Sequence, residues 1–188
     1  MLNNYQILQE AAKIVKDNPI NLDEEFLLDI LQMRYRWPKN SVEVISNFCN
    51  PSEAFFGGGH NVLLYDRWYE LYKLGFTTML NNVLDIHPDM RKLEKLLYHY
   101  IGEIPTGNIY MSSGTVKNRP SFDLHSHDYN VISTSIYGTT KWQIESQNKF
   151  LDGVIDIAPG EQVIISSQTK HAVIDSPEKR CNLTLILG

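Results

Sequence analysis

The 188-residue sequence predicts a mostly β protein with helices at its N-terminus, built as a sandwich or barrel. Apolar residues recur at helical spacing in the first part of the chain, whereas from Asn108 onward they alternate with a period of two. The β-rich segments in that second part are short and follow one another at short intervals, as in sandwiches and barrels. A chain of this length can bury one sizeable core, so we expect one compact domain.

Composition and charge argue against several classes of protein. The net charge is −5, whereas general nucleic-acid binding requires a basic surface. The N-terminus has no basic segment followed by an apolar run, and no stretch approaches the roughly 18 apolar residues that span a bilayer. Cys49 and Cys181 are too few and too far apart for a disulfide framework. We therefore expect a cytoplasmic protein without a membrane segment.

Residues 1–60 are expected to form a helical layer. Helices are predicted at 3–17, 22–35 and 41–48, from apolar stripes at helical spacing and from the Pro residues that separate the segments. Asn21 is the expected N-cap of the second helix, because Glu24 follows three residues later as in a capping box.

Residues 61–188 are expected to form the barrel. Two helices are predicted there, at 65–74 and 88–100. Strands are predicted at 76–83, 108–113, 122–127, 131–137, 141–145, 153–157, 162–166, 172–175 and 182–187.

Three histidines are candidate metal ligands. His125 and His127 are two residues apart, so on a strand both imidazoles point to one face and can reach one ion. His171 follows a predicted turn, strand and loop and could return to the same place. Such a set would leave part of the coordination sphere of a metal vacant. Because H-x-H is a short pattern, it also fits histidines with ordinary structural roles.

The spacing around these residues resembles that of the cupin superfamily, in particular its JmjC-type Fe(II)/2-oxoglutarate oxygenases. That family has H-x-D, a strand, and then G-x-K-x-W, followed later by P-G-D, a strand and a distal histidine. The matching residues here are His125, Gly138, Trp142, Pro159, Gly160, Glu161 and His171. The resemblance covers roughly residues 65–188. It implies a double-stranded β-helix (cupin or jelly-roll) barrel with a helical outer layer.

The resemblance also implies a metal held by His125, His127 and His171. Fe(II) is the expected ion, and Zn, Ni or Mn are alternatives. His127 departs from the family pattern, because it stands where the family has a carboxylate. Three neutral ligands leave the ion its full charge, so the centre would bind anions. This ligand set is also similar to that of three-histidine cupins that do not use 2-oxoglutarate.

A second departure concerns the residue that would hold 2-oxoglutarate. Thr140 stands where the family usually has a basic residue, and Lys141, one step along the strand, should face the other way. Arg180, nine residues after His171, lies near where a different oxygenase branch places its arginine. Lys141 and Arg180 are therefore the candidate cations for the co-substrate. Candidate hydrogen-bonding residues are Tyr110, Ser135 and Thr140.

Three functions remain open from the sequence. The first is a JmjC-like oxygenase that hydroxylates a peptide or small molecule with 2-oxoglutarate and O2. The second is a three-histidine metal cupin, a dioxygenase or isomerase, that does not use 2-oxoglutarate. The third is a non-catalytic cupin that serves as a binding module.

Overall fold

A computed structural model describes residues 4–34, 36–45, 55–57, 61–102, 104–114, 122–145, 153–174 and 178–188. Within these ranges, no helix combines the length and the apolar character needed to cross a membrane. Cys181 is a buried free thiol, and Cys49 lies outside the described residues.

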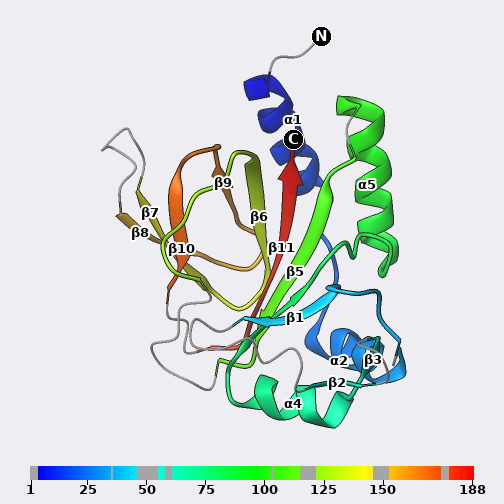
Figure 1. The fold of residues 1–188 in the computed structure, drawn as a ribbon. Coiled ribbons are helices and arrows are strands. Elements are labelled where there is room, and N and C mark those ends of the chain that lie inside the picture. Colours follow the sequence, from blue (N-terminus) through cyan, green and yellow to red (C-terminus); the bar gives the residue numbers. More distant parts are fainter. Residues whose placement is uncertain are drawn as a thin grey trace.

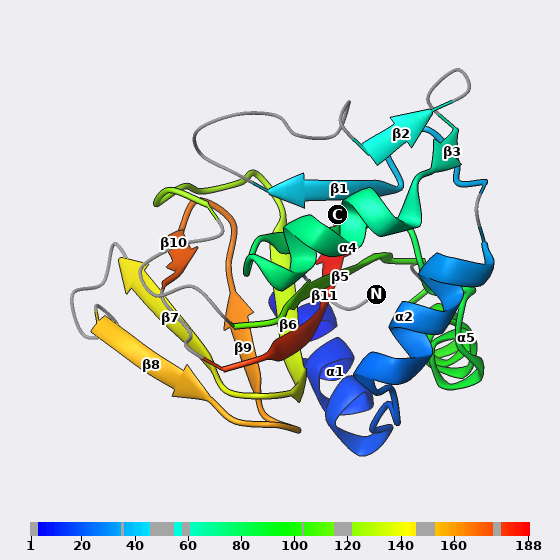
Figure 2. The ribbon, with the colours of Figure 1, turned by 90° about the horizontal axis from the view of Figure 1, so that it is seen from below.

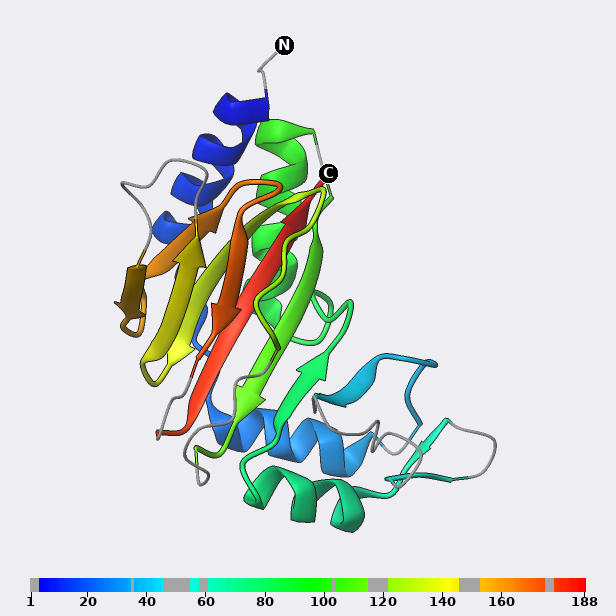
Figure 3. The same cartoon turned by 60° about the vertical axis from the view of Figure 1, so that its left-hand side comes forward.

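Two antiparallel sheets of unequal size pack face to face (Figures 1 and 3). The six-stranded sheet has the order β1 (Val42–Ile45), β4 (Thr77–Leu80), β5 (Thr106–Ser112), β11 (Arg180–Leu187), β6 (Asn130–Tyr137), β9 (Gln162–Ile165). The three-stranded sheet has the order β10 (Lys170–Val173), β7 (Thr140–Glu145), β8 (Gly153–Ile157). A separate two-stranded ribbon pairs β2 (Phe56–Gly57) with β3 (Val62–Leu63).

A small apolar core joins the two sheets. Its buried residues come from both sheets and are Val131, Trp142, Ile157, Val163 and Ile165. Because strand side chains alternate between faces, each strand supplies only every second residue to this core.

Helices cover the opposite face of the large sheet (Figure 2). Helices α1 (Asn4–Asp17) and α5 (Pro88–Ile101) pack side by side, and Gln162 on β9 donates to the carbonyl of Ala12 on α1. Helices α2 (Glu24–Met33) and α4 (Tyr65–Lys73) lie towards one end of the sheet. Full burial of one Leu or Ile contributes about 1.5–3 kcal/mol. The core beneath the helices has many more buried apolar residues than the core between the sheets, so it contributes most of the apolar stabilisation.

Strand β11 has one face towards the helices and the other towards the three-stranded sheet. Cys181, Leu183 and Leu185 are buried in the core beneath the helices. Arg180 and Asn182 point the other way, into the space between the sheets. The central strand therefore separates an apolar layer from a polar pocket.

Two local predictions in the N-terminal layer are wrong. The segment expected to be a helix at 41–48 forms strand β1 at Val42–Ile45 and pairs with β4, while residues 46–48 lie outside the described ranges. Val42 and Val44 are buried with a period of two, which an edge strand satisfies and a helix does not. The expected helical layer of residues 1–60 thus also contributes a strand to the large sheet.

The N-cap of α2 also differs from the prediction. Asp23 caps the helix, since its Oδ1 accepts from the backbone N of Phe26 at 2.8 Å. The backbone N of Asn21 instead donates to Asp89 on α5 at 3.2 Å. Glu24 is therefore not part of a capping box with Asn21, and its carboxylate makes tertiary contacts, described below.

The turn between β6 and β7 depends on Gly138. Its φ is +70°, and Ser135 Oγ donates to its carbonyl at 2.6 Å. A side chain at this position would overlap the backbone carbonyl of Lys179, just before β11. Replacing Gly138 with Ala should therefore lower the free energy of unfolding by at least about 2 kcal/mol, measured by urea denaturation.

Gly160 provides the matched control for Gly138. It also has a positive φ, +83°, but a side chain there meets nothing within 4 Å. Gly160→Ala should cost only about 1 kcal/mol, for the left-handed conformation alone. Equal losses in the two variants would show that the contact with Lys179 is unimportant.

Candidate metal centre

A reciprocal backbone contact joins two of the candidate ligands. The backbone N of His125 donates to the carbonyl of His171 at 3.1 Å, and the N of His171 donates back at 2.8 Å. This isolated bridge brings together residues that are 46 positions apart in the chain. In an antiparallel pair of this kind the two side chains stand beside each other on the same face.

The segment around His125 is not the strand predicted at 122–127. Only His125 makes a β-bridge there, and Leu124 is exposed rather than turned inward. His127 is held instead by the loop before β10, where the backbone N of Gln168 donates to its carbonyl at 2.7 Å. The side chain of Gln168 also donates to the carboxylate of Asp128, which does not belong to the group of candidate metal ligands.

The three imidazoles converge. Ring centroids lie 4.9 Å apart for His125 and His127, 4.7 Å for His125 and His171, and 4.6 Å for His127 and His171. One ring nitrogen from each residue lies within 4.8 Å of those of the other two. Within the described part of the chain, no other group of histidine, cysteine and carboxylate residues is arranged to hold an ion.

The protonation of these rings suits a metal. Nδ1 of His125 contacts the carbonyl of Asp123 at 2.7 Å, and Nδ1 of His171 contacts the carbonyl of Thr169 at 2.9 Å. A carbonyl only accepts, so Nδ1 of each ring is the donor, and Nε2 is the ring atom available to a metal. Burial lowers the pKa of His171 to about 4 and also lowers the pKa of His127, so these two rings are neutral at neutral pH. The donor set therefore fits a divalent ion of the Fe, Zn, Ni or Mn kind.

Aromatic and polar side chains surround the histidines in one pocket between the sheets. Phe122, Tyr129 and Trp142 line it, with the ring of Tyr129 centred 4.5 Å from that of His127. Further lining residues are Tyr110, Val131, Ser133, Val173, Arg180, Asn182, Thr184 and Ile186. No Asp or Glu occurs among the described residues of this lining.

One wall of the pocket is rich in hydrogen-bond donors. Arg180 is 4% exposed, and burial lowers its pKa to about 10, which leaves the guanidinium charged at neutral pH. Asn182 is 2% exposed; Thr140 Oγ1 donates to its Oδ1 at 2.6 Å, which fixes the amide. Its Nδ2, like Nε1 of Trp142, has no hydrogen-bond partner in the described structure. A buried unpaired donor costs about 1–3 kcal/mol. A ligand with acceptor atoms would remove this cost by accepting hydrogen bonds from these donors.

Only two of the five residues predicted to bind a co-substrate line the pocket. Tyr110 and Arg180 line the pocket with the histidines, whereas Ser135, Thr140 and Lys141 do not. Ser135 stabilises the Gly138 turn and Thr140 orients Asn182. Lys141 is half-exposed and forms an ion pair with Asp156 on β8 at 3.7 Å.

Sequence reasoning missed Asn182, although strand alternation could have found it. Asn182 lies two residues after Arg180 and therefore shares its face of β11. The predicted strand began at Asn182, two residues too late to reveal that shared face. Of the remaining histidines, His87 caps α5 and His99 is exposed on that helix, while His60 lies outside the described residues.

Two antiparallel sheets face each other, and three histidines converge in the pocket between them. The chain has the cupin fold, as the family resemblance implied, and its three converging histidines could hold a metal ion. No family model matches the chain, and no curated protein matches its sequence.

Among solved structures, the chain is similar to YcfD, a ribosomal oxygenase from Escherichia coli. The two share 13% identity with a TM-score of 0.51, over 90% of this chain and 44% of YcfD. A cupin superfamily protein from Desulfitobacterium hafniense shares 11% identity over 44% of this chain and 66% of its own, with a TM-score of 0.36. A conserved protein of unknown function from Streptococcus pyogenes shares 14% identity over 44% and 63%, with a TM-score of 0.36. The chain thus spans less than two thirds of the length of each of these three structures.

Removing one histidine should abolish stoichiometric metal binding. For His127→Ala we expect affinity for Fe(II) or Zn(II) to fall by more than the roughly 10- to 100-fold that follows loss of an outer-shell partner. Elemental analysis and competition with a chelator measure this. The control is His99→Ala on the exposed face of α5, which should bind one equivalent as the unmodified protein does. Equal binding by both variants would rule out the histidine centre.

The metal-free protein should lose stability on acidification because of His171. Its pKa is about 4 in the folded state against 6.5 for an ordinary histidine, chiefly through burial. Between these values the unfolded chain binds more protons, so the free energy of unfolding falls as the pH is lowered. The loss attributable to His171 is about 2–3 kcal/mol.

Urea denaturation from pH 7 to pH 4, with a chelator present, measures this slope. His171→Asn keeps a donor for the Thr169 carbonyl but cannot titrate, so its stability should change less over the same range. Parallel curves for the two proteins would contradict the assignment.

Proposed function

We propose that the protein is a metal-dependent oxygenase of the JmjC-like cupin type. It would hydroxylate a peptide or a small molecule, with Fe(II) as the metal and 2-oxoglutarate and O2 as co-substrates. The observation that carries this proposal is the position of Arg180 and Asn182. They place a buried guanidinium and an amide whose Nδ2 has no hydrogen-bond partner in the pocket that also contains the three histidines.

These two residues suit a dicarboxylate co-substrate. A buried carboxylate needs a cation and further donors, since an unpaired buried charge costs several kcal/mol. Arg180 supplies the charge, and Asn182 supplies an N–H on the same face of β11. Burial raises the pKa of Tyr110 to about 12, so its hydroxyl remains protonated and can also donate. The co-substrate would therefore be held at one end by β11 and reach the metal with the other.

The remaining pocket residues have complementary roles in this proposal. His125 and His171 would hold the ion through Nε2, because their Nδ1–H groups contact backbone carbonyls, and His127 would hold it through one ring nitrogen. Fe(II), when bound there, supplies the activation of O2 and the oxidation of a C–H bond. Phe122 lies beside His125 and Trp142 beside His171, where both rings would limit the access of water.

One observation favours a second candidate, a three-histidine dioxygenase or isomerase that does not use 2-oxoglutarate. His127 stands in place of the expected carboxylate, and Asp128, which is hydrogen-bonded to Gln168, is not part of the group of candidate ligands. Three neutral ligands leave two positive charges on the ion, which favours a substrate that binds the metal directly as an anion. In this case Arg180 and Asn182 would hold that substrate.

Anaerobic titration with Fe(II) and then 2-oxoglutarate distinguishes the candidates. The oxygenase should develop a visible charge-transfer band on addition of 2-oxoglutarate, and should release succinate once O2 is admitted. Arg180→Met should keep the metal but weaken 2-oxoglutarate binding by about 30-fold or more, because it removes a buried charge partner. Absorption spectroscopy at increasing 2-oxoglutarate concentration measures the difference.

The matched control is Lys141→Met, which removes a cation that lies outside the pocket lining. This variant should bind 2-oxoglutarate as the unmodified protein does. Metal binding without the charge-transfer band would favour the three-histidine alternative. Absence of metal binding would leave the non-catalytic binding module.

A further inference from the structure

Arg180 is immediately preceded by a lysine that points to the other side of the sheet. The Arg180 side chain is buried and lines the histidine pocket, and its Nη2 donates to Thr77 Oγ1 at 3.3 Å. The Lys179 side chain is 63% exposed and contacts the N-terminal helical layer instead. Lys179 and Arg180 are adjacent in the chain, so a contact that fixes the Lys179 side chain also restrains the backbone that carries Arg180.

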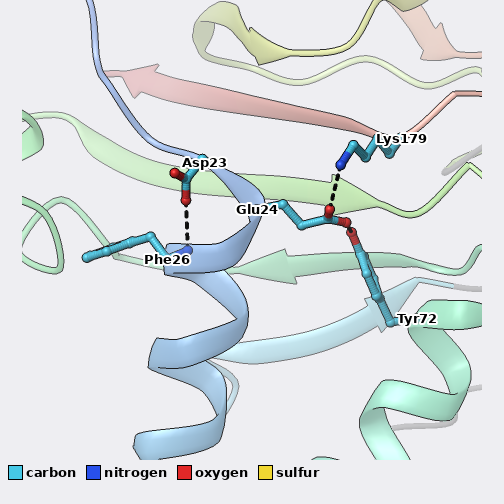
Figure 4. Close-up of polar contacts among 5 residues, drawn as sticks. All are labelled: Asp23, Glu24, Phe26, Tyr72 and Lys179. Atoms are coloured by element: carbon cyan, nitrogen blue, oxygen red, sulfur yellow. Dashed lines mark hydrogen bonds and ion pairs between the residues drawn. The ribbon is translucent and has the colours of Figure 1, made fainter.

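The partner of Lys179 is Glu24, the first residue of α2 (Figure 4). Glu24 Oε2 accepts from Lys179 Nζ at 2.8 Å, and Glu24 Oε1 accepts from the hydroxyl of Tyr72 on α4 at 2.5 Å. Tyr72 is itself 2% exposed. Burial tends to raise the pKa of Glu24, but its bonds to Lys179 and Tyr72 outweigh this and lower it, so the carboxylate is charged at neutral pH. One carboxylate thus ties two helices to the start of β11.

The backbone at this point is also confined by two glycines. A side chain at Gly114 would overlap the backbone of Glu178, and one at Gly138 would overlap the carbonyl of Lys179. The chain before Arg180 therefore passes between two close backbone neighbours, and the Glu24 carboxylate fixes the Lys179 side chain from the helical layer. These contacts restrict both the path and the rotation of the backbone at the start of β11, where Arg180 lies.

We propose that Glu24 is a positioning residue for Arg180. By binding Lys179 and Tyr72, it fixes the start of β11 and thereby the place of the guanidinium in the pocket. This inference rests on the proposed function only in naming 2-oxoglutarate as the anion that Arg180 binds. The positioning itself is a property of the metal-free protein and can be tested separately.

The test uses two variants that remove the ion pair from either side, Glu24→Gln and Lys179→Met. Gln keeps an oxygen for Tyr72, and Lys179 is mostly exposed, so both proteins should fold. The first readout is the Nε–H signal of Arg180 in a 15N-correlation spectrum of the full chain, assigned by its loss in Arg180→Met. Both variants should shift this signal, which a merely stabilising surface pair would not do.

The second readout is the affinity for 2-oxoglutarate in the presence of Fe(II) without O2. Each variant should weaken it by about 3- to 10-fold, as expected for a residue that acts through a packed neighbour. The double variant should be no weaker than either single variant, because both remove one contact. Glu70→Gln is the control, since it breaks a 2.7 Å ion pair with Lys73 on α4 that does not involve β11.

An Arg180 signal that stays in place in Glu24→Gln and Lys179→Met would overturn the inference, as would an equal shift in Glu70→Gln. Failure of the unmodified protein to bind 2-oxoglutarate would instead contradict the proposed function. In that case a shifted Arg180 signal would still support positioning by Glu24.

Discussion

The two-sided burial of β11 is the constraint on which the rest of the structure depends. A strand that is covered on both faces of its sheet usually has an almost fully apolar sequence. Here Leu183 and Leu185 meet the helices, while Arg180 and Asn182 occupy the other side. Polar groups so deeply buried are stable only if they are hydrogen-bonded or find a partner in a ligand. The same strand therefore holds the apolar core together and gives the pocket its polarity.

The histidines meet through backbone pairing rather than through the regular strand that was expected. His125 belongs to a loop and approaches His171 at a single bridge, with two hydrogen bonds of 3.1 and 2.8 Å. One carbonyl fixes the ring of His125 and another fixes that of His171. The pocket is thus pre-arranged by main-chain contacts, which depend little on the side chains around them.

Much of the fold could be predicted from local patterns, because its elements have clear signals. The helix at 88–101 begins with His87-Pro88 and ends at Gly102, and the strand predicted at 131–137 forms β6. The segment V-E-V-I at 42–45 lies within the helix predicted at 41–48. Only its pairing with β4, more than 30 residues away, decides that it is a strand.

The candidate site could be predicted in part. The spacing of the histidines predicts the metal ligands. The position of Arg180, nine residues after His171, makes it a candidate cation for the co-substrate. The orientation of Asn182 depends on Thr140, 42 residues away, and the use of Glu24 depends on Lys179, 155 residues away. Such contacts form only in the complete tertiary structure, so a short stretch of sequence does not predict them.

The unpartnered donors on the pocket wall have a thermodynamic consequence. A molecule that binds only the folded chain stabilises it by mass action, in proportion to the logarithm of its free concentration above the dissociation constant. Because Asn182 sits on the strand that also anchors the helical core, an occupant of the pocket is linked to unfolding of the whole molecule. Melting temperatures recorded across a panel of carboxylates would thus rank candidate ligands before any turnover is known.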